Sequence, residues 1–148
     1  FELRYLLSRL TVEKIMSTPV ITVTPKTPLE EAARIMADKK IGGLPVIDGD
    51  NMVGIITESD LFKIFVELLG ARKRGVRVTL IVPDIKGQLA TLTSAIALKG
   101  GNFIALSTLE GIRPGTFEVM LKVTDLDVTT VGEILGRLNV EMIDIREV

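Results

Sequence analysis

The chain contains no cysteine, no histidine and no tryptophan, and only 4% of its 148 residues are aromatic. Without cysteine it has no disulfide bonds, thiolate nucleophiles or cysteine metal ligands, which fits a reducing compartment. Without histidine it lacks the usual general base at neutral pH and the commonest transition-metal ligand. These absences argue against most kinds of enzymatic catalysis, and we expect neither a metal site nor a cofactor.

The charge balance and the apolar pattern exclude further partners. The 18 basic and 19 acidic residues leave a net charge of −1, so no overall field attracts nucleic acid or an anionic membrane. The sequence has no uncharged apolar run of the roughly 18 residues that a membrane-spanning helix needs. The length suits one ordinary domain or two small ones. No signal peptide is visible, and we expect a cytoplasmic protein.

Residues 11–69 read as helix, strand, helix, strand, strand, helix. The apolar residues 20–23 predict a short strand. Residues 27–30, Thr-Pro-Leu-Glu, have the pattern of a capping box with proline at the first helical position, and Glu30 is spaced to pair with Arg34. Two apolar runs flanking residues 48–51 predict a hairpin. The last helix has an apolar face made by Leu61, Ile64, Phe65 and Leu68.

The second apolar run ends in Thr57, Ser59 and Asp60, where the last helix begins. A hydroxyl-rich helix start with free backbone N–H groups is a natural place for a ribose and a phosphate. The Asp60 carboxylate accepts hydrogen bonds and suits ribose hydroxyls, whereas the Thr57 hydroxyl can donate to a phosphate oxygen. The alternative is that these residues only cap the helix.

Residues 40–48 followed by residues 54–60, Gly-Ile-Ile-Thr-Glu-Ser-Asp, closely resemble a CBS domain. The resemblance implies a β-α-β-β-α fold whose repeats pair into a Bateman module and bind adenine nucleotides or S-adenosylmethionine between them. The implied contacts are Thr18, Pro19 and Ile21 on one wall, Ile41, Gly42 and Gly43 at the adenine, and Ile55, Thr57, Ser59 and Asp60 at the ribose and phosphate.

Gly42 and Gly43 stand where some nucleotide-binding repeats carry cationic residues or histidine. Charge compensation would then come from Lys39, Lys40, Lys63 or a partner chain. We therefore expect adenosine, AMP or S-adenosylmethionine rather than ATP.

The sequence holds one copy of the motif, whereas a Bateman module needs two. Residues 1–10 read as a helix without an N-cap, and we interpret them as a connecting helix from a preceding repeat. Its apolar face consists of Leu3, Leu6, Leu7 and Leu10. An upstream repeat or a second subunit would then complete the pocket.

Residues 70–76 are polar, basic and flanked by glycine. A solvated linker is the favoured interpretation over a phosphate or nucleic-acid patch, because no aromatic side chains are interleaved. From residue 77 to 148 the order is strand, helix, strand, strand, helix, strand, the split βαβ sandwich. Asp125 or Asp127 is expected to start its last helix, and the alternation of its last strand slips near residues 142–143, which predicts a bulge.

Residues 84–89 and 100–104 of this half resemble the two characteristic turns of an ACT domain. The resemblance implies a ferredoxin-like βαββαβ fold, a side-by-side homodimer and an amino acid bound at its interface. The implied contacts are Asp84, Gly87, Leu89, Asn102 and Phe103. In the alternative reading Asp84 caps a helix, Gly87 relieves crowding and Asn102 takes a left-handed turn.

The whole chain is therefore expected to be α+β, a CBS domain followed by an ACT domain, and it is similar to AcuB-type acetoin-utilisation proteins. The leading hypothesis is a non-enzymatic regulatory sensor of an adenosyl ligand that dimerises through the ACT half. A second hypothesis is a pure assembly module without a ligand. An enzyme is a third, in which Glu58 and Asp60 share acid–base work, but no nucleophile or metal cluster accompanies them.

Overall fold

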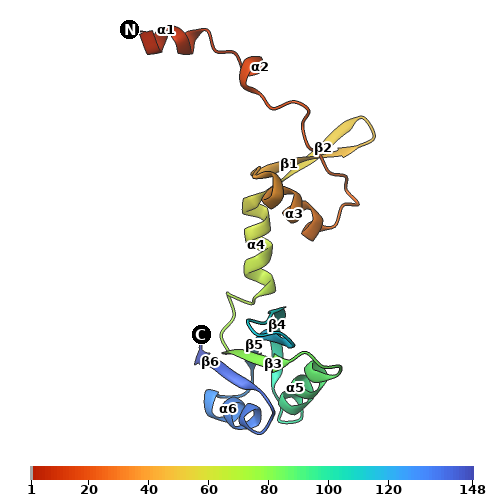
Figure 1. The fold of residues 1–148 in the computed structure, drawn as a ribbon, viewed down its shortest axis with the longest axis vertical. Helices are drawn as coiled ribbons and strands as arrows, with labels where there is room; N and C mark the ends of the chain where they lie inside the picture. The colour runs from red at the N-terminus through yellow and green to blue at the C-terminus, as the bar shows by residue number, and fades with distance from the viewer. Residues whose placement is uncertain (1) are drawn as a thin grey trace. The chain divides into compact units, whose positions relative to one another are not determined.

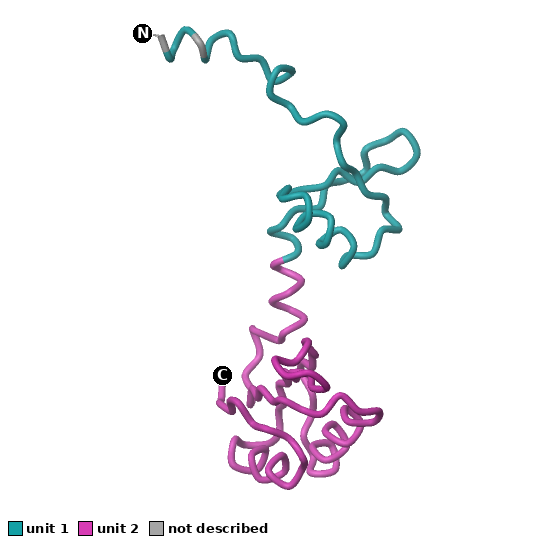
Figure 2. The backbone as a smooth tube through the Cα atoms, viewed as in Figure 1, with its two compact units in different colours: residues 1–61 teal, residues 62–148 magenta. Residues whose placement is uncertain are grey.

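The computed structural model describes residues 2–148, apart from the side chains of Glu2 and Leu6. The expected Leu6 contribution to an apolar helix face lies outside this description. The chain folds into two compact units, residues 1–61 and 62–148 (Figure 2). The boundary between them falls within one continuous helix, α4 (Glu58–Leu68). Each unit has a hydrophobic core of its own.

The first unit contains a β-hairpin packed on one helix (Figure 1). Its elements are α1 (Glu2–Ser8), α2 (Val12–Ile15), α3 (Leu29–Lys39), β1 (Gly43–Asp48) and β2 (Asn51–Thr57). Strands β1 and β2 pair antiparallel, as the sequence predicts. The core of this unit is small and consists of Val23, Ala32, Met36 and Leu44, with partly buried aliphatic side chains around it.

The predicted strand over residues 20–23 is wrong in extent, because only Val23 pairs, in a single parallel bridge to Val46. The predicted capping box is also wrong. The Thr27 hydroxyl accepts from the Thr24 backbone N–H at 3.0 Å, and the N-cap is Pro28, which has no side-chain cap. Thr27 therefore closes the turn before the helix and does not cap it.

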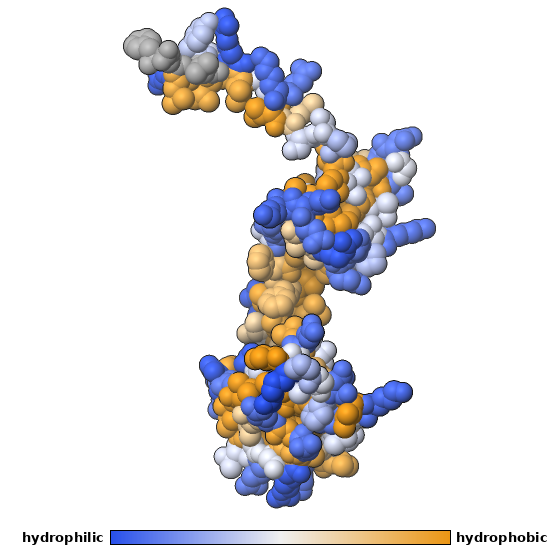
Figure 3. Space-filling view, in the orientation of Figure 1, coloured by the Kyte–Doolittle hydropathy of each residue, from blue (hydrophilic) through white to orange (hydrophobic). Residues whose placement is uncertain are grey.

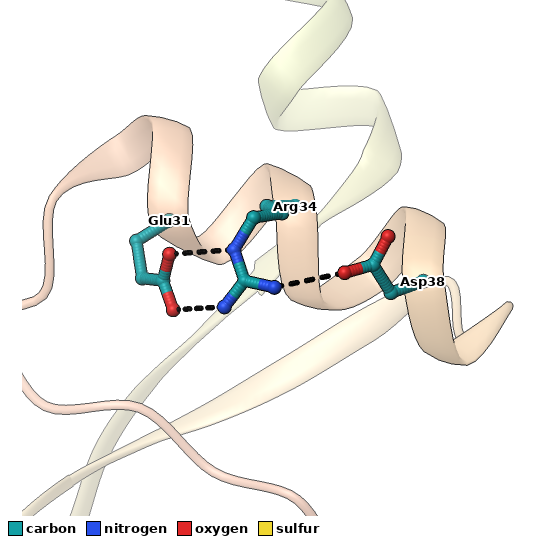
Figure 4. Close-up of polar contacts among 3 residues, drawn as sticks. All are labelled: Glu31, Arg34 and Asp38. Carbon is teal, nitrogen blue, oxygen red and sulfur yellow. Dashed lines mark hydrogen bonds and ion pairs between the residues drawn. The ribbon is translucent and has the colours of Figure 1, made fainter.

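The expected Glu30–Arg34 pair is replaced by two other partners (Figure 4). Arg34 donates to Glu31 at 2.9 and 2.6 Å and to Asp38 at 2.8 Å. The hydrogen bond from Arg34 holds the pKa of Glu31 below its ordinary value. These side chains are exposed, so solvent screens the network and it adds little to stability.

The second unit has the βαββαβ order that the sequence predicts. Its elements are β3 (Val76–Pro83), α5 (Gln88–Ala97), β4 (Asn102–Glu110), β5 (Thr116–Thr124), α6 (Val128–Gly136) and β6 (Glu141–Glu147). The antiparallel strands lie in the order β4-β5-β3-β6, and both helices cover one face of the sheet (Figure 1). Period-two aliphatic residues of β3 and β5 pack there against Leu92, Ile96, Val131 and Leu135.

The two edges of this sheet differ. Edge strand β6 carries a bulge, because Leu80 pairs with Met142 and Thr79 with Asp144, which leaves Ile143 extra. This confirms the predicted slip, and the same strand carries charged residues on both sides of the bulge. Edge strand β4 has no charged side chain from residue 102 to 109. Strand β4 has a register irregularity of its own, between Phe103 and Ala105. Because charged side chains discourage edge-to-edge pairing, the uncharged β4 is the more open edge.

Of the helix caps that the sequence suggests for this unit, the structure shows one and not the other. Asp127 caps α6 by accepting from Thr130 N–H at 2.7 Å, which selects it over Asp125. Asp84 does not cap α5, since the N-cap is Gly87 at φ 86°. An added Cβ at Gly87 would meet nothing within 4 Å, so crowding is not the reason for a glycine at this position. The positive φ of its backbone is the reason. Asn102 lies in a strand and takes no left-handed turn.

Candidate functional site

The predicted adenosyl site gathers at the open end of the β1–β2 hairpin. Gly43 and Thr57 are paired residues in the antiparallel register, so the start of β1 lies beside the end of β2. The Glu58 backbone N–H donates to the Gly42 carbonyl at 3.1 Å. An added Cβ at Gly43 would lie 3.7 Å from Ile55 Cδ1. The hairpin therefore brings the glycine pair, Ile55 and the first turn of α4 to one place.

Thr57 and Asp60 bind each other at this place. One carboxylate oxygen of Asp60 accepts from the Thr57 backbone N–H at 3.1 Å and from its hydroxyl at 2.7 Å. This is the capping arrangement that was the alternative interpretation. The Thr57 hydroxyl donates its proton to Asp60, so its oxygen can only accept further hydrogen bonds. Such a pair suits the hydroxyls of a ribose better than the oxygens of a phosphate.

The segment that contains Thr18, Pro19 and Ile21 is attached to β1 through Val23. Val23 donates to the Pro45 carbonyl at 3.0 Å and accepts from Ile47 N–H at 2.8 Å. Ile21 lies two residues before this bridge, and Thr18 and Pro19, joined by a cis peptide bond, precede it. Ile55 is 58% exposed, so this side of the site is open to solvent.

Glu58, which the sequence suggested only for acid–base work and not for ligand binding, also lies at this end of the hairpin. Its Oε2 atom lies 3.6 Å from the position that a Cβ of Gly42 would take. Glu58 and Asp60 therefore place two carboxylates at this end of the hairpin.

The predicted amino-acid contacts lie at opposite ends of the second sheet. Asp84 follows the end of β3 that pairs with Thr116, whereas Asn102 pairs with Thr124 at the other end. A nine-residue strand separates these ends by about 27 Å. Phe103 packs against the core. Within one chain, these residues do not converge on one ligand.

A pocket of about 420 Å³ lies at the Asp84 end. It is lined by Asp84, Leu89, Thr108, Leu109, Glu110, Thr116 and Phe117. Sequence reasoning selected the first two of these residues and missed those of edge strand β4. Among the described residues, no acidic cluster could hold a metal ion, and no helix is long and apolar enough to cross a membrane.

Comparisons with known proteins assign both units. Residues 12–67 match the CBS domain family, and residues 74–146 match the TTHA0829-like ACT domain family. An inosine-5'-monophosphate dehydrogenase of Thermoplasma acidophilum is 47% identical over 49 residues, which are 33% of this chain and 10% of that protein. An uncharacterised protein of Methanocaldococcus jannaschii is 38% identical over 73 residues, 49% of this chain and 39% of that protein.

The CBS domain-containing protein YhcV of Bacillus subtilis is 40% identical over 50 residues, which are 34% of this chain and 36% of that protein. The chain thus spans between 10% and 39% of the length of these relatives. The match to the dehydrogenase covers only the CBS part. The order of the two matched families agrees with the two folds. The chain thus carries a match to the CBS domain family followed by a match to the TTHA0829-like ACT domain family, a combination that indicates a regulatory ligand-sensing module.

Proposed function

We propose that the CBS half binds an adenosine-containing ligand with little phosphate charge, of the adenosine, AMP or S-adenosylmethionine class, and that the chain acts as a non-enzymatic cytoplasmic sensor. The observation that carries this proposal is the hydrogen bond from Glu58 N–H to the Gly42 carbonyl. It joins the glycine pair to a helix start whose side chains include acceptors for ribose hydroxyls.

The charges at the site support the choice of ligand. Glu58 and Asp60 place two carboxylates at this end of the hairpin, and these would repel a phosphate chain brought beside them. Lys39 and Lys40 at the end of α3 supply nearby positive charge. An adenosyl ligand with little phosphate charge therefore fits better than ATP. The exposed Ile55 supports completion of the pocket by a second repeat or a second chain.

Asp60→Ala is expected to weaken binding of the adenosyl ligand about 10-fold or more, because hydrogen bonds to a charged group contribute about 1.5–3 kcal/mol. Isothermal titration calorimetry of the full chain with adenosine, AMP, ADP, ATP and S-adenosylmethionine measures this. Asp50→Ala, in the exposed hairpin turn, is the control and should bind like wild type. Asp60→Asn, which keeps an acceptor for the helix cap, separates lost binding from lost structure. Tightest binding to ATP, or unchanged binding by Asp60→Ala, contradicts the proposal.

For the ACT half we propose a side-by-side homodimer through edge strand β4, with an amino acid bound at the interface. Antiparallel pairing of two β4 strands about a twofold axis would set the Asn102 end of one copy beside the Glu110 end of the other. The separated contacts Asp84 and Asn102 would then approach each other across the interface. The pocket at Asp84 lies at this end and includes residues of β4, which supports a shared site.

Leu106→Lys is expected to raise the dimer dissociation constant at least 10-fold, because a lysine on a strand edge disfavours pairing. Sedimentation velocity over a range of concentrations measures it. Leu98→Lys is the matched control, since Leu98 is highly exposed just after α5 and lies outside the edge. An unchanged dimer in Leu106→Lys, or an equal loss in the control, argues against this interface.

A pure assembly module is the alternative, and the surface of α4 favours it. Apolar side chains gather along α4 (Figure 3), with Phe62, Phe65 and Leu68 exposed. Thermal melts separate the two functions, because a ligand at 100 times its dissociation constant adds about 2.7 kcal/mol of stability. A flat melting temperature across a metabolite panel favours assembly. The similarity to AcuB-type acetoin-utilisation proteins is a further proposal, which a functional assay in that pathway would test.

A further inference from the structure

Lys122 on β5 is a buried charged side chain, only 4% exposed. A buried ammonium is costly unless it is paired and hydrogen-bonded. Its Nζ donates to the Gly70 carbonyl at 3.0 Å and also to the Lys73 carbonyl. Both acceptors lie in the segment directly after α4, about fifty positions earlier in the chain. Lys122 therefore joins the sheet of the 62–148 unit to the end of α4.

The acceptors belong to an ordered helix terminus. Gly70 takes φ 59°, its N–H donates to Glu67 at 3.0 Å, and Ala71 N–H donates to Val66 at 3.0 Å. This is a Schellman motif, which satisfies the last carbonyls of α4 within the helix end itself. Gly70 is buried, and an added Cβ would collide with Ile104 of β4. Far from being a solvated spacer, this turn is held on the sheet.

The other end of α4 carries the Thr57–Asp60 pair of the proposed ligand site. The helix is continuous over 11 residues, so its ends are about 16 Å apart. In the sheet, Lys122 pairs with Ala105 of β4, the open edge strand. Through Lys122, the C-terminal end of α4 is thus joined to β5, the strand that pairs with β4.

We propose that Lys122 is a positioning residue that fixes the C-terminal end of α4 on the ACT sheet, so that ligand occupancy at the first turn of α4 changes pairing at β4. The coupling part of this proposal rests on the proposed function, whereas the anchoring part does not. Lys122 touches neither ligand. It acts through the backbone of Gly70 and Lys73.

Hydrogen exchange of the ligand-free full chain tests the anchor. Residues 69, 70, 71, 73 and 75 donate backbone hydrogen bonds in this segment. In Lys122→Met these amides are expected to exchange at least 10-fold faster. Lys122→Arg, which keeps the donors, and Lys99→Met, an exposed lysine after α5, should stay within threefold of wild type. Unchanged exchange in Lys122→Met overturns the proposal.

A second comparison serves if Lys122→Met does not fold. Lys122→Gln is uncharged and one bond shorter than lysine, so its amide reaches the carbonyls less well than a guanidinium does. We expect faster exchange over residues 69–75 in Lys122→Gln than in Lys122→Arg. Equal exchange in these two variants counts against the anchor.

The coupling is tested by the dimer dissociation constant with and without saturating S-adenosylmethionine or AMP. Wild type is expected to change at least fivefold, in line with typical coupling energies. Lys122→Met should bind the probe within twofold of wild type yet change its dimer constant less than twofold. A retained fivefold change overturns the coupling. If no adenosyl probe binds wild type, the proposed function fails, and the exchange experiment still decides the anchor.

Discussion

Leu44→Ala is expected to unfold the 1–61 unit while the 62–148 unit keeps its fold. Leu44 is fully buried in a core of four residues, so its truncation removes a large share of that core. Truncating a buried leucine costs about 2–5 kcal/mol. A unit of this size has little stability to spare.

Hydrogen exchange followed by mass spectrometry resolves the two units in one experiment. In Leu44→Ala, amides of β1 and β2 should exchange freely while amides of β3 and β5 stay protected. Val53→Ala, on the exposed side of the same hairpin, is the control and should change stability by less than about 0.5 kcal/mol. Simultaneous loss of protection in both units would show that they do not fold separately.

Gly75→Ala is expected to destabilise the 62–148 unit by about 1–3 kcal/mol or more, as overpacking does. An added Cβ would press on the backbone carbonyl of Val123, which cannot move cheaply within the sheet. Gly75 also exchanges two backbone hydrogen bonds with Val148, at 2.9 and 3.0 Å. The residue cannot shift away from the clash without breaking them.

Urea unfolding monitored by circular dichroism measures the change. Gly136→Ala is the matched control, because an added Cβ at the end of α6 meets nothing within 4 Å. It should be neutral, or more stable by up to about 1 kcal/mol, since alanine is the better helix former. A Gly75→Ala protein as stable as this control would mean that the close approach at Val123 relaxes without cost.

The order of the elements was predictable because each depends on local periodicity. Val78, Leu80 and Val82 alternate within β3, and all three are fully buried against the helices. The bulge at Ile143 was visible as a break in the same alternation. Asp127 could be proposed as a cap because a side chain that bonds its own backbone needs no distant partner.

The choice among near-equal local partners was not predictable. Arg34 has acidic residues three before, four before and four after it, and such pairs differ by only a few tenths of a kcal/mol. The Thr27 hydroxyl could accept a hydrogen bond either as a helix cap or from the Thr24 backbone N–H, and in the structure it accepts from Thr24. For Arg34 and for Thr27, the sequence identifies the possible hydrogen-bond partners, and the folded structure determines which of them are used.

Long-range features were beyond sequence patterns. Lys122 occupies an outward position of β5, where period two predicts solvent, yet the turn at Gly70 covers it. The α4 helix is the opposite case, because side chains that the pattern expects to be buried are exposed. Its periodic apolar face indicates a surface that needs burial, but Phe65 and Leu68 of that face are exposed in the described chain. The pattern says nothing about which partner covers it. In the same way, Asp84 and Asn102 match one motif family while the sheet separates them.

The unequal edges of the second sheet have a consequence for the size of any assembly. Identical chains that join through two different surfaces can add without limit, whereas chains that join through one self-complementary surface stop at a closed pair. The charges of β6 disfavour the addition of another strand at that edge. Pairing along β4 would therefore leave the two charged β6 strands at the ends of the joined sheet, which disfavours growth of filaments by strand addition.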